Sequence, residues 1–171
     1  VAIRMDGNGR WGRPNKKSRN LGHRQGLKTV EMVLEETIKN KIKFLTLYAF
    51  STENWKRPRI EIRFLLNLLE TFLKENIDKL DKNNIRLKVI GNLVRFPTKI
   101  QNLLTTSQQR TKKNSKLQLN LALNYGSKDE IIRAIKIIKN KKYEVNEKIL
   151  NKFLYTFGIP DPDILIRTGD T

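Results

Sequence analysis

The spacing of apolar residues along the chain predicts short β-strands that alternate with helices. Apolar runs or alternating apolar positions predict strands at residues 1–5, 44–50, 85–91, 117–126 and 164–166. The intervening segments predict helices at residues 27–39, 61–80, 97–112, 128–139 and 146–157. A short helix is expected at residues 8–12, ended by Pro14 and followed by a polar loop at residues 15–20. This order is typical of an α/β fold with a mostly parallel sheet and helices on both faces.

The 171 residues fit one domain. The strand at residues 44–50 is apolar on both faces, which predicts a central position in the sheet. No internal repeat or low-complexity linker divides the chain, and the absence of a GxGxxG motif argues against a dinucleotide site. Because Val1 already lies in an apparent strand, we expect the natural N-terminal start of the protein to be missing.

Composition excludes some chemistry and leaves several partners open. The chain has no cysteine, which excludes disulfides, thiolate zinc sites and a thiol nucleophile. No apolar run reaches the ~18–20 residues that span a bilayer. The net charge of +18 fits nucleic acid, an anionic membrane or a phosphorylated substrate. Runs rich in Lys and Asn, at residues 39–41, 82–84 and 139–142, also fit solvated helix ends, and no aromatic stripe or zinc-finger pattern accompanies them.

The first candidate site follows directly on the first predicted strand. Asp6 ends that strand, and Gly7-Asn8-Gly9-Arg10 comes next. Glycines let backbone amides approach a phosphate, and a helix that starts there adds its positive end. A carboxylate beside a phosphate needs a cation between them, so the pattern indicates a carboxylate, a divalent metal and a phosphate. A plain turn is the alternative. Lys17 at the closing position excludes an EF-hand, and the lack of GxxxxGK[ST] excludes a Walker loop.

Polar residues also follow two other predicted strands. The strand at residues 44–50 runs into Ser51-Thr52-Glu53-Asn54-Trp55-Lys56-Arg57-Pro58, and the last strand ends in Arg167-Thr168-Gly169. Open parallel sheets bind ligands at the carboxyl ends of their strands. Part of the pattern has a simpler explanation, because Ser51 or Thr52 also suits a helix cap.

Two further features have both a functional and a structural interpretation. His23, the single histidine, lies near a helix start beside Arg19 and Arg24, so it either contacts phosphate or is structural. The helix at residues 61–80 has a wide apolar face, which packs in the core or forms one wall of an apolar tunnel.

Five blocks, in order, carry a specific resemblance over nearly the whole chain. They are Met5-Asp6-Gly7-Asn8-Gly9-Arg10-Trp11, Gly22-His23-Arg24, Tyr48-Ala49-Phe50-Ser51-Thr52-Glu53-Asn54-Trp55-Lys56-Arg57-Pro58, Asn124-Tyr125-Gly126 and Asp163-Ile164-Leu165-Ile166-Arg167-Thr168-Gly169. The chain resembles the cis-prenyltransferases, the family of undecaprenyl and dehydrodolichyl diphosphate synthases. The resemblance implies an enzyme that condenses isopentenyl diphosphate repeatedly onto an allylic diphosphate, usually farnesyl diphosphate, to make a long-chain Z-polyprenyl diphosphate.

The resemblance also implies roles for individual residues. Asp6 would hold Mg²⁺ against a substrate diphosphate and aid departure of the allylic diphosphate. The implied substrate-binding set is Gly7, Asn8, Gly9, Arg10, Trp11, Arg19, His23, Ser51, Thr52, Glu53, Trp55, Arg57 and Arg167. Its members up to His23 would hold or contact the allylic substrate, and the last three would position or grip isopentenyl diphosphate.

Catalysis and product length are assigned to other residues. Asn54 matches a residue proposed to help remove the proton after condensation, with a diphosphate oxygen or water as the alternative acceptor because an amide is a poor base. Glu61 would brace Arg57. The candidate tunnel wall, between the sheet and the long helix, consists of Leu65, Leu68, Leu69, Ile85 and Leu117.

The resemblance implies partners and leaves alternatives. We expect a homodimer, or a heterodimer with an accessory subunit, without nucleic acid. We expect it in the cytoplasm or on the cytoplasmic face of an anionic membrane, with an organelle as the alternative if a targeting segment is missing. Family members continue with an Arg, a Ser and a carboxylate, and Asp170-Thr171 stands where Gly-Glu is usual. The resemblance therefore implies that a C-terminal part of the protein is missing, and we expect no turnover from this chain alone. A non-catalytic accessory subunit and a nucleic-acid-binding protein are the alternatives. The presence of Asp6, Asn8, Arg10 and Asn54 favours catalysis.

Overall fold

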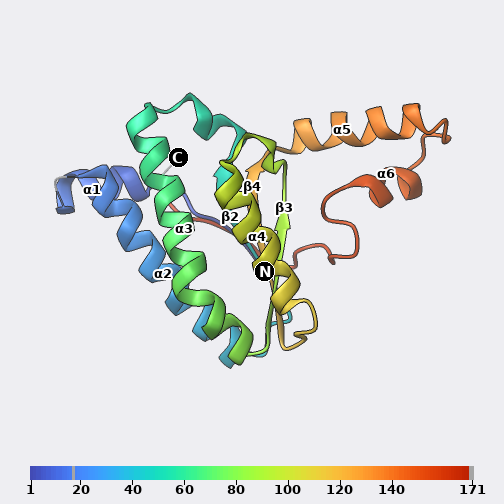
Figure 1. Cartoon of the computed structure of the whole chain (residues 1–171). Coiled ribbons are helices and arrows are strands. Elements are labelled where there is room, and N and C mark those ends of the chain that lie inside the picture. Colours follow the sequence, from blue (N-terminus) through green and yellow to red (C-terminus); the bar gives the residue numbers. More distant parts are fainter. Residues whose placement is uncertain (17, 170–171) are drawn as a thin grey trace.

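A computed structural model describes residues 1–16 and 18–169 as a five-stranded sheet with six α-helices (Figure 1). The strands are β1 (Ala2–Arg4), β2 (Phe44–Ser51), β3 (Ile85–Ile90), β4 (Leu117–Tyr125) and β5 (Leu165–Arg167). The helices are α1 (Asn8–Lys16), α2 (Arg19–Lys39), α3 (Arg59–Lys82), α4 (Thr98–Thr111), α5 (Ser127–Asn140) and α6 (Glu147–Phe153), with 3₁₀ turns η1 (Thr52–Lys56) and η2 (Leu93–Arg95). All five predicted strands are confirmed, and the predicted ends of the strands and of α3 to α5 differ by at most two residues.

The strand order is β3-β4-β2-β1-β5, and every neighbouring pair is parallel. β2 therefore lies in the centre of the sheet, as its apolar character predicted. The register places Ile3 beside Leu47 on one side and Ile166 on the other. Because β1, β2 and β5 are neighbours that point the same way, the polar residues that follow them meet at one edge of the sheet.

Alternate residues of the central strands form the core with α2, α3 and α4. Leu45 and Leu47 of β2 are at most 1% exposed, and Leu119 of β4 is fully buried. Leu73 of α3 and Leu104 of α4 pack into the same apolar cluster. Each fully buried leucine contributes roughly 1.5–3 kcal/mol relative to an exposed one. This packing fixes α3 over the sheet and places its N-terminal half beside the strand ends.

The opposite face of the sheet is covered in another way. Helices flank the sheet as predicted, but α5 and α6 pack on each other beside it (Figure 1). The segment at residues 156–164, which starts in a turn and contains no helix or strand, instead lines a cavity together with Thr46 and Tyr48 on this face. The side chain of Asn120 on this face donates to Thr46 Oγ1 at 3.0 Å, so buried polar groups are satisfied here.

The first two helices are longer than predicted. α1 continues past Pro14, the predicted loop at residues 15–20 is partly helical, and α2 begins at Arg19, well before residue 27. A proline inside a helix removes one backbone donor and crowds the preceding turn, but close packing of α1 on α2 supports both helices. A Cβ atom on Gly22 would lie 2.0 Å from the carbonyl oxygen of Asn8. This glycine, expected before the helix, therefore lies inside it and permits the close crossing.

The helix predicted at residues 146–157 is shorter in the structure. The side chain of Asn146 caps α6 by accepting the Ile149 N–H at 3.0 Å. The chain leaves the helix after Phe153, because Tyr155 donates its N–H to Glu130 at 2.5 Å instead of continuing the helical bonding. Asp170 and Thr171 lie outside the described residues. Among the helices that are described, none is long and apolar enough to cross a membrane.

Candidate active site

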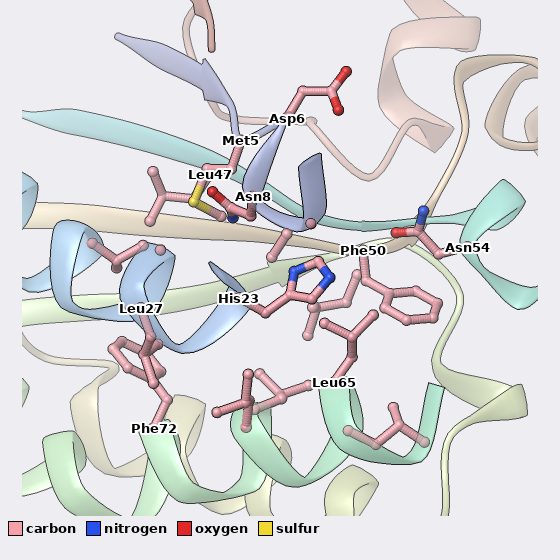
Figure 2. A pocket seen from close by; sticks show the side chains of 18 of the residues that line it. Met5, Asp6, Asn8, His23, Leu27, Leu47, Phe50, Asn54, Leu65 and Phe72 are labelled. Atoms are coloured by element: carbon pink, nitrogen blue, oxygen red, sulfur yellow. The ribbon is translucent and has the colours of Figure 1, made fainter. Parts of the chain in front are cut away.

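A pocket lies between the carboxyl ends of β1 and β2 and the helices α2 and α3 (Figure 2). Its polar lining side chains are Asp6, Asn8, Arg10, Arg19, His23, Asn54 and Arg57. Its apolar lining side chains are Met5, Leu27, Val30, Leu47, Ala49, Phe50, Leu65, Leu66, Leu68, Leu69, Phe72, Leu121 and Leu123. In Figure 2, His23 lies between Asp6 at the top and Phe72 at the bottom. One cavity thus joins a charged surface to an apolar one.

Asp6 is held by groups from two neighbouring strand ends. Its Oδ1 accepts the Gly7 N–H at 2.8 Å, and its Oδ2 accepts Arg167 Nη2 at 3.1 Å. Arg10 Nη2 lies 3.7 Å from Oδ1. Partial burial raises the pKa of Asp6, but the Arg167 hydrogen bond, the Gly7 N–H and the Arg10 charge together bring that pKa below its usual value. Asp6 is therefore an ionised carboxylate at neutral pH.

The loops after β1 and β5 are bonded to each other. The Asp6 N–H donates to Thr168 Oγ1 at 2.9 Å, and the Thr168 hydroxyl lies 2.8 Å from the Asp6 carbonyl oxygen. Gly7 and Gly169 have φ values of +86° and +82°, which favour glycine, and a Cβ on Gly7 would lie 3.0 Å from Gly169 Cα. These contacts fix Asp6 relative to Arg167. The role of Thr168 was not predicted, because a threonine in a turn gives no distinctive signal.

The residues around Asp6 fit one kind of metal site and not another. Within residues 1–16 and 18–169, no group of three or more His, Cys, Asp or Glu side chains could hold a metal ion. Mg²⁺ is usually bound by one or two carboxylates together with substrate phosphates and water. A single ionised carboxylate beside Arg10 and Arg167 fits an ion shared with a bound phosphate. The described side chains at this site do not make up a metal site built from protein ligands alone.

Three pocket side chains converge on one oxygen of Glu61. Arg57 Nη1 lies 2.9 Å from Glu61 Oε1, Arg19 Nη2 lies 3.2 Å away and His23 Nε2 lies 3.3 Å away. Burial raises the pKa of Glu61, but hydrogen bonds and charges from its partners lower it overall. Burial lowers the pKa of His23 below its usual value; Glu61 raises it in part, and the charges of Arg57 and Arg19 lower it.

The predicted contact in which Glu61 supports Arg57 is confirmed as an ion pair. The contacts of Glu61 with Arg19 and His23 were not predicted. A signal for them was present in the sequence, because Arg19 and His23 have i,i+4 spacing, as do Arg57 and Glu61. What the sequence did not show was that the two pairs face each other.

The Gly-Asn-Gly stretch forms the start of α1 and lines the pocket with Gly7, Asn8 and Gly9. Gly9 lies against Arg19, since a Cβ there would be 3.1 Å from the guanidinium carbon. The start of a helix carries a partial positive charge, which suits an anion. Trp11 is 43% exposed and does not belong to the lining residues.

The polar residues after β2 divide into two groups. Asn54 lines the pocket, and its Oδ1 accepts the Ser51 N–H at 3.0 Å. Trp55 instead packs on Phe96, with ring centroids 5.4 Å apart, and donates Nε1–H to Asn124 Oδ1 at 2.8 Å. The contacts of Trp55 are therefore with other residues of the protein core region, and Trp55 itself does not line the pocket. The substrate-binding candidates that do not line the pocket are Trp11, Ser51, Thr52, Glu53, Trp55 and, at the end of β5, Arg167.

The candidate tunnel residues are also divided. Leu65, Leu68 and Leu69 line the pocket, whereas Ile85 and Leu117 are 2% and 1% exposed core residues. The latter two pair at the amino ends of β3 and β4, away from the strand edge where the pocket lies. Apolar lining residues of α2 and Phe72 of α3 were missed, because an apolar helical stripe looks the same in a core and in a pocket. A continuous tunnel stays a prediction.

The fold and the pocket define an α/β protein that can bind molecules with an anionic group and an apolar part. Residues 4–171 match the family described as "Putative undecaprenyl diphosphate synthase", and the chain belongs to this family. It is a cis-prenyltransferase, as the motif blocks predicted. An isoprenyl transferase of Wolinella succinogenes is 48% identical over 169 residues, which cover 99% of this chain and 74% of the relative. An isoprenyl transferase of Clostridium perfringens is 45% identical over 174 residues, covering 98% and 69%.

Solved structures give the same result. A probable undecaprenyl diphosphate synthase from Campylobacter jejuni matches with a TM-score of 0.82 and 39% identity, covering 99% of this chain and 74% of that one. Lavandulyl diphosphate synthase from Lavandula x intermedia, solved with dimethylallyl diphosphate, matches with a TM-score of 0.91 and 26% identity, covering 98% and 75%. The relatives are named as transferases or synthases, which supports a catalytic chain over a non-catalytic accessory subunit and over a nucleic-acid-binding protein.

Proposed function

We propose that the protein condenses isopentenyl diphosphate stepwise onto an allylic diphosphate, farnesyl diphosphate, to make a long-chain Z-polyprenyl diphosphate. The observation that carries this proposal is the single pocket in which arginines, a histidine and an ionised carboxylate adjoin apolar side chains of α2, α3 and the sheet. An allylic diphosphate has the same two parts, an anionic head and a hydrocarbon tail. The family membership supports the reaction class.

The residues of the pocket suggest how the reaction proceeds. In each step the allylic carbon–oxygen bond breaks, a carbon–carbon bond forms and a proton leaves the new product. Arg10, Arg19 and His23, with the start of α1, would hold the departing diphosphate and stabilise its growing charge. The apolar residues of α3 would shield the tail from water. Asn54 would orient a water molecule or a diphosphate oxygen that accepts the proton.

A second part of the proposal concerns Mg²⁺. Asp6 would hold the ion against a diphosphate, and the ion would neutralise charge on the leaving oxygens. Arg167, which is bonded to Asp6, would bind the isopentenyl diphosphate when that contact opens. Homodimer formation and contact with an anionic membrane, which fits the net charge of +18, are further proposals.

The test uses the full-length protein with farnesyl diphosphate, radiolabelled isopentenyl diphosphate and Mg²⁺. We expect labelled long-chain product that disappears with a chelator and falls by about 10²–10³-fold in Asp6→Ala, the range for loss of one electrostatic stabiliser. Glu70→Gln is the matched control, because Glu70 pairs with Lys74 and Lys99 and does not line the pocket. No product from folded protein, alone or with a candidate partner subunit, would refute the catalytic proposal.

A further inference from the structure

Glu61 lies behind the cationic side chains of the pocket rather than in its wall. Arg19, His23 and Arg57 all line the pocket, whereas Glu61 does not. The side chain of Glu61 is only 11% exposed, and its Oε1 receives the three side chains at 2.9–3.3 Å. The contacts connect α2, which carries two of these partners, to the start of α3. One buried oxygen thus joins two elements on either side of the pocket.

The negative charge of Glu61 orients its cationic partners but does not neutralise their combined positive charge. A carboxylate oxygen has two lone pairs, so it cannot make three equally good hydrogen bonds. Two guanidinium groups carry two positive charges and Glu61 carries one negative charge, which leaves a net positive cluster even with neutral His23. Such a cluster still attracts an anion. All three partners of Glu61 also line the pocket, so this positive charge lies at its wall.

Arg19 shows that the arrangement is tightly built. One of its guanidinium nitrogens is bonded to Glu61, and the guanidinium lies against Gly9, where there is no side chain to displace it. Its Nε is buried and, within the described part of the chain, has no hydrogen-bond partner. Arginine side chains lose roughly 2 kcal/mol of rotamer freedom when they are fixed. A carboxylate that fixes two of them before an anion arrives lowers the cost of binding.

We propose that Glu61 is a positioning residue that holds Arg19, His23 and Arg57 as a preformed cradle for a diphosphate group. The proposal deepens the proposed function and rests on it for the identity of the ligand. Two other roles of Glu61 would involve the same contacts and predict different results. If Glu61 competes with the ligand, its removal tightens anion binding, and if it only packs the fold, its removal leaves binding unchanged.

The test measures binding of inorganic pyrophosphate to the full-length protein by isothermal titration calorimetry. Glu61→Gln keeps the size of the side chain and removes its charge. We expect the dissociation constant to rise about tenfold, which corresponds to 1.4 kcal/mol, although the site becomes more positive. Glu61→Asp keeps the charge but is one methylene shorter, so it should give an intermediate loss. Glu70→Gln removes a carboxylate of the same helix that is paired with two cations, Lys74 and Lys99, outside the pocket, and this variant should bind like the wild type.

The outcomes separate the three roles. Tighter binding in Glu61→Gln would show competition, and unchanged binding with a lower melting temperature would show packing alone; either result overturns the proposal. In turnover assays a positioning role raises KM for the allylic diphosphate more than it lowers kcat. If the wild type binds pyrophosphate in a Glu61-dependent way but makes no polyprenyl product, the proposed function fails and the cradle stands.

Discussion

Two buried glutamates, Glu61 and Glu130, share a residue type and differ in their surroundings. Glu61 is 9% exposed and contacts two arginines and a histidine. Glu130 is 4% exposed, and its partners are neutral: it accepts the Tyr125 hydroxyl at 2.6 Å and the Tyr155 N–H at 2.5 Å. Burial raises the pKa of Tyr125 above its usual value, and the hydrogen bond to Glu130 adds to the shift.

The difference shows that burial alone does not identify a functional carboxylate. Glu130 ties α5 to the segment that leads to β5, and Arg133 supports the same turn by lying over the Tyr155 ring and donating to the Phe153 carbonyl. The hydrogen bonds of Glu130 give the hydroxyl of Tyr125 and the N–H of Tyr155 an acceptor. Glu61 has more cationic partners than it can satisfy, and all of them line a cavity. An excess of cations, rather than a buried acid, indicates a binding site.

The largest expected effect concerns Glu130. Glu130→Ala leaves the Tyr125 hydroxyl and the Tyr155 N–H without their acceptor, so we expect the free energy of unfolding to fall by about 2–4 kcal/mol. Urea unfolding measures this change. Pyrophosphate affinity should stay within about twofold, because Glu130 does not line the active-site pocket. A folded, equally stable Glu130→Ala protein with weakened pyrophosphate binding would break the contrast between the two glutamates.

The elements around both glutamates were largely predictable because their apolar periods are clear. The leucines of β4 alternate and those of α3 recur at helical spacing, and packing enforces both patterns. Helix propensity alone mispredicted the ends of helices at the point where two helices pack on each other. Gly22 is a poor helix former, yet it lies inside α2 because α1 crosses there at a distance that only glycine permits. Such tertiary contacts have no signature in a single sequence.

The second prediction compares an arginine near Glu61 with an arginine near Glu130. Arg57→Met removes a guanidinium that lines the pocket while keeping most of the side-chain volume, and we expect pyrophosphate to bind about 10–100-fold more weakly, as for loss of a charged hydrogen bond. Arg133→Met should change pyrophosphate affinity by less than about twofold, because Arg133 contacts Phe153 and Tyr155 outside this pocket. Equal losses in the two variants would indicate general attraction by the basic surface.

In the candidate site, the polar residues at the strand ends were predicted from the sequence more accurately than the apolar residues that line the pocket. Asp6 and Arg167 meet because β1 and β5 are neighbours, and the parallel order made that edge predictable. Ile85 and Leu117 were placed in the tunnel wall but lie at the other end of their strands. Each of these two residues begins its predicted strand, so the rule that parallel sheets bind ligands at the carboxyl ends of their strands already argued against a place in the pocket wall. Which apolar side chains of α2 and α3 line the pocket depends on how these helices pack on the sheet, and an apolar stripe alone does not show this.

The third prediction concerns the protonation of His23. The pKa of His23 lies below its usual 6.5 because burial and the neighbouring arginines outweigh Glu61. The unfolded chain therefore binds more protons as the pH falls below about 6.5, so acidification should destabilise the folded protein in that range. NMR can follow the ring directly, since it belongs to the single histidine. Glu61→Gln should lower the pKa of His23 further, because it removes the carboxylate that raises it, whereas Glu130→Gln should leave it unchanged. A rise in Glu61→Gln would contradict this ordering of charges.

The smallest expected effect tests whether the position of a guanidinium matters when no charge is changed. A Cβ added at Gly9 would lie 3.1 Å from the Arg19 guanidinium carbon, so Gly9→Ala must push that group by a few tenths of an ångström. We expect pyrophosphate to bind roughly two- to threefold more weakly, ~0.5 kcal/mol. The same substitution in Glu61→Gln should cost less, because Arg19 is no longer fixed between Gly9 and the carboxylate. A double-mutant cycle measures this coupling. Additive effects would mean that Gly9 and Glu61 act independently, and the cradle would then not be a single preformed unit.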